Sequence, residues 1–236
     1  MSSNQIIIRN NYFKQFVDSF IYFLESDLAP KRNIPIYLYD CTENTFPLRN
    51  DSFILYNCEQ LTRSSKLENF LISIIKNKPT ELWDYSQVNI DILKKHGIEA
   101  TLVPIESPQW YIDKLLTWRN NQIIYDFGFC GTVSPKRQFI VCSLQKKGFS
   151  FLALTNVWGE ERDKQLAKCR VLINIHVNDE YNVFESARCE PWLKAGVPVI
   201  SETSLDNDPR CITVEYDNLI ETAVSTLKNI KNTSSV

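Results

Sequence analysis

Short runs of β-branched and aromatic residues alternate with helix-patterned segments along the chain. The runs occupy residues 34–39, 52–56, 81–85, 100–103, 122–130, 149–154, 171–177, 197–201 and 212–215. Between them, apolar residues recur every three or four positions, which is the spacing of one face of a helix. Strands that alternate with helices form parallel sheets covered by helices. The sequence therefore predicts an α/β protein.

The predicted elements form two series, separated by a segment at residues 106–121. The first series opens with a predicted helix at 11–28, and the second opens with a strand at 122–130. Each series has the length of a compact domain. We therefore predict two Rossmann-like domains, at residues 1–120 and 121–236. Sheets of this kind bind ligands at the carboxyl ends of their strands.

The overall charge and the cysteine pattern argue against several classes of protein. The 236 residues include 26 basic and 28 acidic residues without a block of one sign, which disfavours a nucleic-acid partner. No signal-peptide pattern and no run of about 18 apolar residues occur, so we expect a cytoplasmic protein without a transmembrane segment. The seven cysteines have no CxxC spacing, so we expect buried, reduced thiols.

A predicted strand ends at Cys130 and leads into a glycine turn and a capped helix. Ser134 is a good N-cap and Pro135 a good first helical residue. The free N–H groups and the dipole at such a helix start favour an anion. The pattern predicts a phosphate site made by Gly131, Thr132, Ser134, Lys136 and Arg137. The alternative is an ordinary capped helix with two solvated basic residues.

A second segment resembles the donor domain of GT-B fold glycosyltransferases. The match rests on Glu185-Ser-Ala-Arg188 and on Ala195-Gly-Val-Pro-Val-Ile-Ser-Glu202. The resemblance implies a small, divergent enzyme of this fold, with residues 1–120 as the acceptor domain and 121–236 as the donor domain. It implies no cofactor beyond the nucleotide-sugar donor, which is the expected partner, and it leaves the acceptor unidentified.

The same resemblance implies roles for individual residues. Glu185 would hold the donor ribose, Arg188 would place the diphosphate, and the basic pair at 136–137 would neutralise its charge. Ser186 and His176 complete the expected donor site. The widespread retaining subgroup carries two glutamates eight residues apart, whereas here Pro191 takes the second position. From the residues alone, Glu185 and Arg188 also fit an i,i+3 salt bridge, and His176 fits a hydrogen-bonded core residue.

The first half supplies the candidates for a general base. Glu59 and Asp84 each follow a predicted strand, in segments similar to those of small GT-B-like proteins. An inverting transferase needs a base, so the expected catalytic residues are Glu59, Asp84 and Arg137. The alternative is turn chemistry, in which Asn57, Asp84 and Ser86 cap the neighbouring helices.

Several motifs are absent from the sequence. There is no P-loop, GxGxxG, HExxH, GxSxG or Asp-x-Asp. The expected function is therefore transfer of a sugar from a nucleotide diphosphate donor to an acceptor without a bound metal. The alternative is a non-catalytic nucleotide- or sugar-binding protein that retains the fold.

Overall fold

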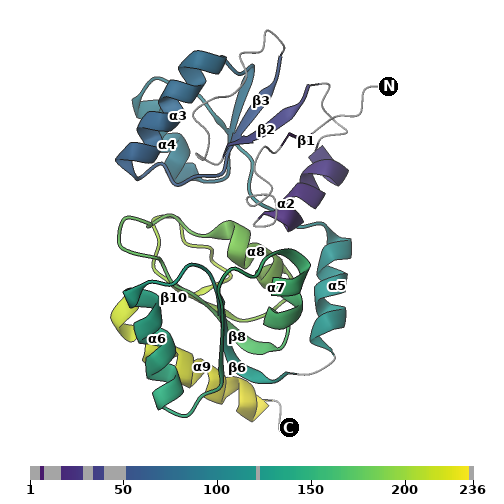
Figure 1. Cartoon of the computed structure of the whole chain (residues 1–236), viewed down its shortest axis with the longest axis vertical. Coiled ribbons are helices and arrows are strands. Elements are labelled where there is room, and N and C mark those ends of the chain that lie inside the picture. The colour runs from purple at the N-terminus through teal and green to yellow at the C-terminus, as the bar shows by residue number, and fades with distance from the viewer. Residues whose placement is uncertain (1–5, 8–16, 29–33, 40–51, 121–122, 234–236) are drawn as a thin grey trace. The chain divides into compact units, whose positions relative to one another are not determined.

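The computed structural model describes residues 6–7, 17–28, 34–39, 52–120 and 123–233. It is an α/β protein with two parallel sheets flanked by helices (Figure 1). The chain divides into two compact units. Unit 1 contains the described residues up to Pro108 together with 180–183, and unit 2 contains Gln109–Asp179 and the residues from Phe184 onward. This division assigns helix α5 (Gln109–Arg119) to unit 2, whereas the expected boundary at 120 places it in the first half.

Unit 1 is built on a sheet whose strands lie in chain order. The sheet order is β1-β2-β3-β4-β5, and every neighbouring pair is parallel. The strands are β1 (Ile6–Ile7), β2 (Ile36–Tyr39), β3 (Ile54–Asn57), β4 (Glu81–Asp84) and β5 (Thr101–Leu102). Among the described strands, each new strand is added on the same side of the one before it, so the order of the sheet does not reverse.

The helices of unit 1 cover hydrophobic side chains of its sheet. They are α2 (Asp18–Phe23), which continues as a π-helical turn at Leu24–Leu28, α3 (Ser64–Asn77) and α4 (Gln87–Lys95). Phe70 of α3 and Leu93 of α4 pack with Tyr39 and Leu55. Tyr56 follows Leu55 and contacts Phe20 of α2, with ring centroids 5.0 Å apart. Successive strand residues face opposite sides, so β3 is buried on both faces.

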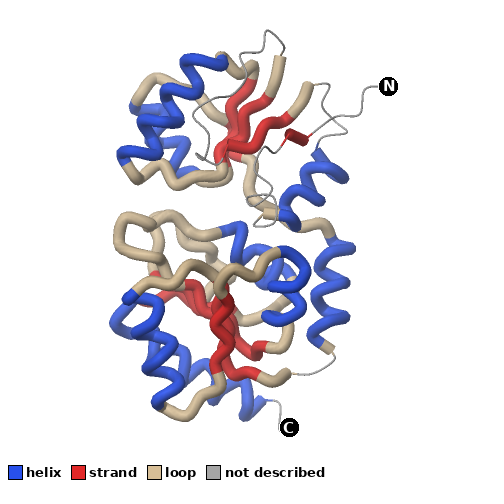
Figure 2. The backbone as a smooth tube through the Cα atoms, viewed as in Figure 1, coloured by secondary structure: helices blue, strands red, loops and turns tan. Residues whose placement is uncertain are grey.

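Unit 2 is a doubly wound sheet in which the strand order reverses. The order is β10-β9-β8-β6-β7, with all neighbours parallel. Figure 2 shows the strands in red and the helices in blue. The strands are β6 (Tyr125–Cys130), β7 (Phe151–Leu154), β8 (Cys169–Asn174), β9 (Val199–Glu202) and β10 (Ile212–Val214). The chain steps outward from β6 to β7, then returns to place β8 on the other side of β6. The reversal therefore lies between β6 and β8.

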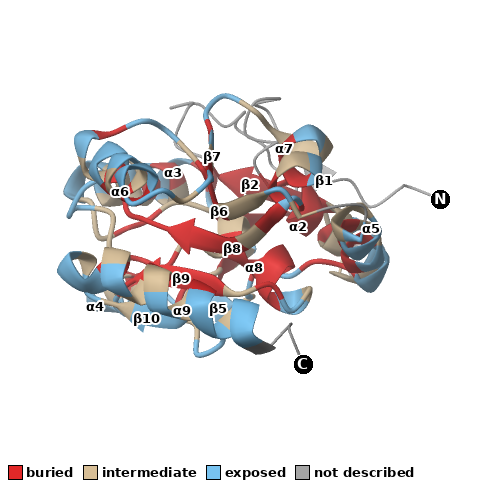
Figure 3. Cartoon of the chain, turned by 90° about the horizontal axis from the view of Figure 1, so that it is seen from below, coloured by how far each residue is buried: buried red, intermediate tan, exposed pale blue. Residues whose placement is uncertain are grey.

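Helices cover both faces of this sheet. They are α5, α6 (Pro135–Lys146), α7 (Gly159–Leu166), α8 (Ser186–Lys194) and α9 (Leu219–Thr233), the last preceded by a 3-10 turn at Tyr216–Asn218. Ile140 of α6 and Leu227 of α9 share one core with Phe127 and Ile173. Helix α5 packs against α7 and α8. Helix α7 contacts β6 and β8, and helix α8 contacts β9. In Figure 3 strand β8 is coloured as buried, while outward surfaces of α5 and α9 are exposed.

Several local expectations are confirmed and others are corrected. Ser134 caps α6 by accepting a hydrogen bond from the Arg137 N–H, and Gly97 follows α4 with a φ of 72°. The segment expected to cross between the halves forms helix α5. The helix expected from Val183 begins at Ser186, and the buried residues Val183 and Phe184 lie in the loop before it. Residues 11–16 of the helix expected at 11–28 lie outside the described part of the chain.

The expectation of buried thiols holds for only part of the cysteines. Cys130, Cys169 and Cys189 are buried, and none of the six described cysteines forms a disulfide. Cys142 is exposed, because it lies on α6 two residues after the buried Ile140 and therefore on a different helix face. Cys58 and Cys211 are partly exposed. Cys41 lies outside the described residues.

We expect Gly128→Ala to lower the free energy of unfolding by about 1–3 kcal/mol, as overpacking of a core does. A Cβ at Gly128 in β6 would lie 2.5 Å from the Cys169 Sγ and 2.9 Å from a Leu172 methyl group, both on β8. Denaturant unfolding of both proteins measures the change. An unchanged denaturation midpoint would show that β6 and β8 accommodate the extra methyl group without a loss of stability.

Candidate functional site

The candidate site lies in unit 2, where the strand order reverses. The carboxyl ends of β6 and β8 point to the same edge of the sheet, where β6 is followed by the Gly131 turn and β8 by residues 175–179. The first turns of α6 and α8 bring their side chains to this edge. A topological reversal leaves a crevice between the two diverging connections, which is where sheets of this type bind ligands.

Gly131 allows two arginine side chains to approach the backbone at the end of β6. Its φ is 153°, and a Cβ there would lie 3.2 Å from Arg137 Nη1 and 3.2 Å from Arg188 Nη2. The same Cβ would lie 2.9 Å from the Phe129 ring. Any larger residue would therefore push against both guanidinium groups, so the glycine is a requirement of the cluster.

Arg137 is buried, and its guanidinium group contacts three groups of the protein. Its side chain is only 4% exposed. Nε donates to the Ile175 carbonyl at 2.9 Å, Nη1 to the Thr132 carbonyl at 2.9 Å, and Nη2 lies 3.3 Å from Glu185 Oε1. Burial, together with the positive charge of Arg188, lowers the pKa of Arg137 to about 10. Three protein partners favour a role in holding the turn, and the expected catalytic role of Arg137 stays a prediction.

Arg188 and Glu185 complete the cluster from the first turn of α8. Arg188 Nη1 donates to Asn174 Oδ1 at 2.8 Å and pairs with Glu185, so the i,i+3 salt bridge is present. The guanidinium carbons of Arg137 and Arg188 lie 5.0 and 5.3 Å from the centre of the Phe129 ring. Arg188 Nε is buried and has no hydrogen-bond partner among the described residues.

The cluster carries an excess of positive charge. Two arginines share one carboxylate, that of Glu185, whose side chain is 11% exposed. The pKa of Arg188 is raised: burial opposes its charge, but Glu185 more than offsets this. A buried cation without a full set of partners is costly, so an anion beside the Gly131 turn would be stabilised. Glu185 binds both arginines, so its carboxylate is less available to a ribose than the resemblance implies.

Lys136 faces a separate groove of about 520 Å³ at the same edge of the sheet. Its Nζ lies 2.6 Å from Asp179 Oδ1 and 2.5 Å from Glu202 Oε1. Glu215 and Tyr216 also line the groove, and the Lys136 Nζ lies 4.8 Å from the centre of the Tyr216 ring. These groups hold three carboxylates and one ammonium, so the groove is acidic. Lys136 is thus paired within the protein instead of being solvated.

The remaining expected donor residues have different surroundings. Thr132 is exposed, and Ser186 is partly buried. His176 is 3% exposed, with its ring Nε2 3.2 Å from the Thr203 carbonyl and 3.1 Å from Ser204 Oγ. Its backbone N–H donates to Glu202 Oε2 at 3.0 Å. These contacts favour the alternative of a hydrogen-bonded core histidine.

Asp84 and Glu59 lie in unit 1 and serve its internal structure. Asp84 is fully buried at the end of β4 and accepts hydrogen bonds from Asn57 Nδ2 at 2.7 Å, from Asn89 Nδ2 at 3.0 Å and from the Ser86 N–H at 2.9 Å. Glu59 pairs with Lys66 at 3.2 Å. Asn57 and Asn89 also donate to the Glu59 carbonyl, so Asp84 organises the loop after β3.

Sequence patterns missed several members of the site. Phe129, Asn174 and Asp179 give no motif signal of their own. Two of them could have been found from their positions in the strands. Asn174 is a polar residue at the end of a strand, and Phe129 lies one residue before a strand ends. Across the described ranges, no three His, Cys, Asp or Glu residues come together as a metal would require. The helices described in the structure include none with the length and apolar character to cross a membrane.

No protein-family model matches the chain. Three uncharacterized proteins of Acanthamoeba polyphaga mimivirus are similar to it. Protein L137 is 43% identical over 118 residues, which is 47% of this chain and 16% of that protein. Protein L140 is 34% identical over 168 residues (66% and 55%), and protein L138 is 30% identical over 260 residues (96% and 29%). The chain thus spans 16–55% of the length of these relatives.

Proposed function

We propose that unit 2 binds the diphosphate of a nucleotide sugar, and that the protein is a metal-independent, GT-B type glycosyltransferase acting on an unidentified acceptor. One observation carries the proposal: the excess positive charge of the Arg137–Glu185–Arg188 cluster lies beside the Gly131 turn at the reversal of the sheet. Ligands of doubly wound sheets bind at this position. The similarity of residues 185–188 and 195–202 to GT-B donor domains adds the expected ligand class.

The cluster suits the departure of a diphosphate. Negative charge grows on the leaving group as the bond to the sugar breaks, and fixed donors in a partly buried site stabilise that charge. Arg188 supplies the unpartnered Nε and the N-terminus of α6 supplies backbone N–H groups. Arg137 holds the turn in place through its bonds to two carbonyls.

The non-catalytic alternative is favoured by the state of the two expected bases. Asp84 is fully buried and its oxygens accept three hydrogen bonds, while Glu59 is paired with Lys66. Both carboxylates are thus engaged by side chains of unit 1. Retaining chemistry requires no such base, so release of the sugar from a donor, by transfer or by hydrolysis, separates the enzyme from the binding protein.

Thermal unfolding with UDP, GDP, ADP, CDP and dTDP tests the binding. A ligand at 100 times its dissociation constant stabilises the folded state by about 2.7 kcal/mol, which is readily measured. We expect one of the five to raise the melting temperature without added metal. Absence of a shift with all five, at millimolar concentration, would contradict the proposed donor site.

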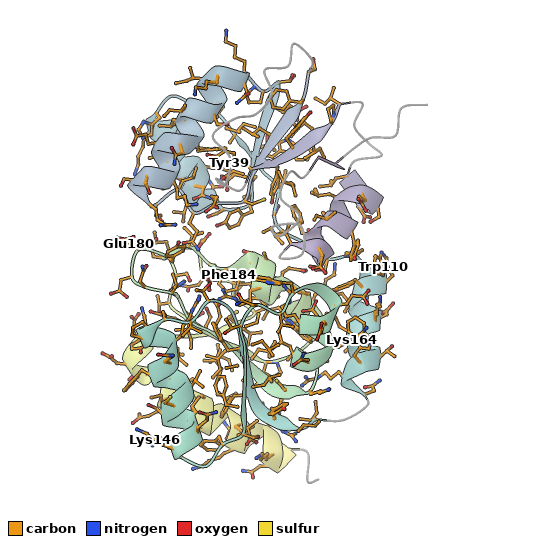
Figure 4. The ribbon with its side chains drawn as sticks, in the orientation of Figure 1. Tyr39, Trp110, Lys146, Lys164, Glu180 and Phe184 are labelled. Atoms are coloured by element: carbon orange, nitrogen blue, oxygen red, sulfur yellow. The ribbon has the colours of Figure 1, made fainter. Side chains whose placement is uncertain are left out.

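Gly131→Ala is expected to remove this ligand-induced shift, because its Cβ fills the space between the two guanidinium groups. Gly148→Ala is the matched control. Gly148 also has a positive φ, 89°, but a Cβ there meets nothing within 4 Å, and it follows Lys146 at the other end of α6 (Figure 4). Both variants carry backbone strain of about 1–3 kcal/mol, so only the loss of binding distinguishes them. Equal shifts in the two variants would remove the Gly131 turn from the site.

A further inference from the structure

The acidic groove beside the cluster holds the basic residue that an anion at the start of α6 would need. Lys136 lies in the first turn of that helix, where the free N–H groups and the dipole already favour negative charge. Its ammonium group is held by two carboxylates, at 2.6 Å from Asp179 and 2.5 Å from Glu202. Partial burial opposes the charge of Lys136, but these carboxylates more than offset it and raise the pKa of Lys136.

The two carboxylates that hold Lys136 differ in how firmly they are fixed. The Glu202 side chain is 9% exposed, and its second oxygen accepts the His176 N–H at 3.0 Å. The Asp179 side chain is 94% exposed and pairs with Lys136 at the rim of the groove. Exposed ion pairs contribute little to stability and are readily exchanged. Glu202 is therefore a permanent partner, and Asp179 is a replaceable one.

We propose that Asp179 occupies the place of an anionic ligand on Lys136 and so sets how tightly phosphate groups bind at the start of α6. This inference rests on the proposed diphosphate site and adds a specificity-determining residue to it. In the free protein the Asp179 carboxylate occupies the exposed side of Lys136, while Glu202 holds its buried side. An arriving phosphate displaces that carboxylate and takes over its contact with Lys136. Removing the Asp179 charge removes the competitor.

Binding of inorganic pyrophosphate, measured by titration calorimetry at low salt, tests the proposal with wild type and four variants. Asp179→Asn is expected to bind pyrophosphate roughly two- to fivefold more tightly than wild type, the factor that an exposed ion pair is worth. Glu180→Gln is the matched control, because it removes the same charge from the adjacent residue of the same loop, labelled in Figure 4. It is expected to change affinity by less than about 1.5-fold, since screening by salt weakens the effect of a charge that lies farther along the loop.

Lys136→Met separates competition from simple repulsion. In that background the Asp179→Asn change is expected to have no effect, because the contact for which the two anions compete is gone. A gain that persists there, or an equal gain in Glu180→Gln, would assign the effect to the general field and overturn the inference. If wild type and Asp179→Asn bind pyrophosphate with the same affinity, the inference is overturned as well. If neither wild type nor Asp179→Asn binds pyrophosphate, the proposed diphosphate site itself fails, and the inference with it.

Discussion

Raising the pH from about 4 to about 7 is expected to lower the free energy of unfolding by as much as about 4 kcal/mol through Asp84 alone. Burial raises the pKa of Asp84 from 3.8 to about 7, although hydrogen bonds from Asn57, Ser86 and Asn89 oppose this shift. The unfolded chain therefore loses this proton near pH 4, whereas the folded protein keeps it until about pH 7. The stabilisation is complete below pH 4 and is lost as the pH rises through 7.

Asp84→Asn isolates this contribution, because the amide does not titrate. Urea unfolding of wild type and variant at several pH values gives two curves, and we expect their difference to change steeply between pH 4 and 7. Asp91→Asn, which changes an exposed carboxylate on α4, is the control and is expected to follow wild type. Parallel curves for wild type and Asp84→Asn would show that Asp84 is ionised throughout, as its three hydrogen-bond donors favour.

Arg137→Ala is expected to lower the free energy of unfolding by about 3–5 kcal/mol, the cost of breaking a buried ion pair from one side. The truncation leaves the carbonyls of Ile175 and Thr132 without their donor and leaves Glu185 with Arg188 alone. It also opens space next to Phe129. Denaturant unfolding followed by circular dichroism measures the loss.

Arg210→Ala provides the comparison for that variant. Arg210 also pairs with a carboxylate, that of Asp208, but its side chain is 48% exposed, so we expect a change below about 1 kcal/mol. If Arg137→Ala were as stable as Arg210→Ala, the buried contacts of Arg137 would not hold the turn. A direct role toward the ligand would then be the better explanation. The comparison thus decides between a structural and a catalytic reading of Arg137.

Local sequence patterns predicted the elements of the candidate site well. Ser134 and Pro135 mark the start of α6 because capping involves residues only three positions apart, and the observed bond from the Arg137 N–H confirms it. The alternation of strands and helices likewise depends on neighbours along the chain. The parallel α/β class was predictable for the same reason.

Long-range partners were not predictable from those patterns. Lys136 and Arg137 are adjacent in sequence, yet one enters an acidic groove and the other a buried cluster. Their partners, Asp179 and Glu185, are about 40 residues away and arrive through β8, which lies beside β6 only because the sheet order reverses. No spacing rule links residues that meet across such a reversal.

The sequence by itself determined most of the strands and helices, where α6 begins, and which charged residues stand at the strand ends. Only the tertiary structure decided which of those charges are buried, which are paired, and which are replaceable. The physical reason is that helix caps and periodicity act over a few residues, whereas burial and ion pairing depend on the order in which distant strands assemble. Arg137, Glu185 and Asp84 acquire their properties only in that assembled environment.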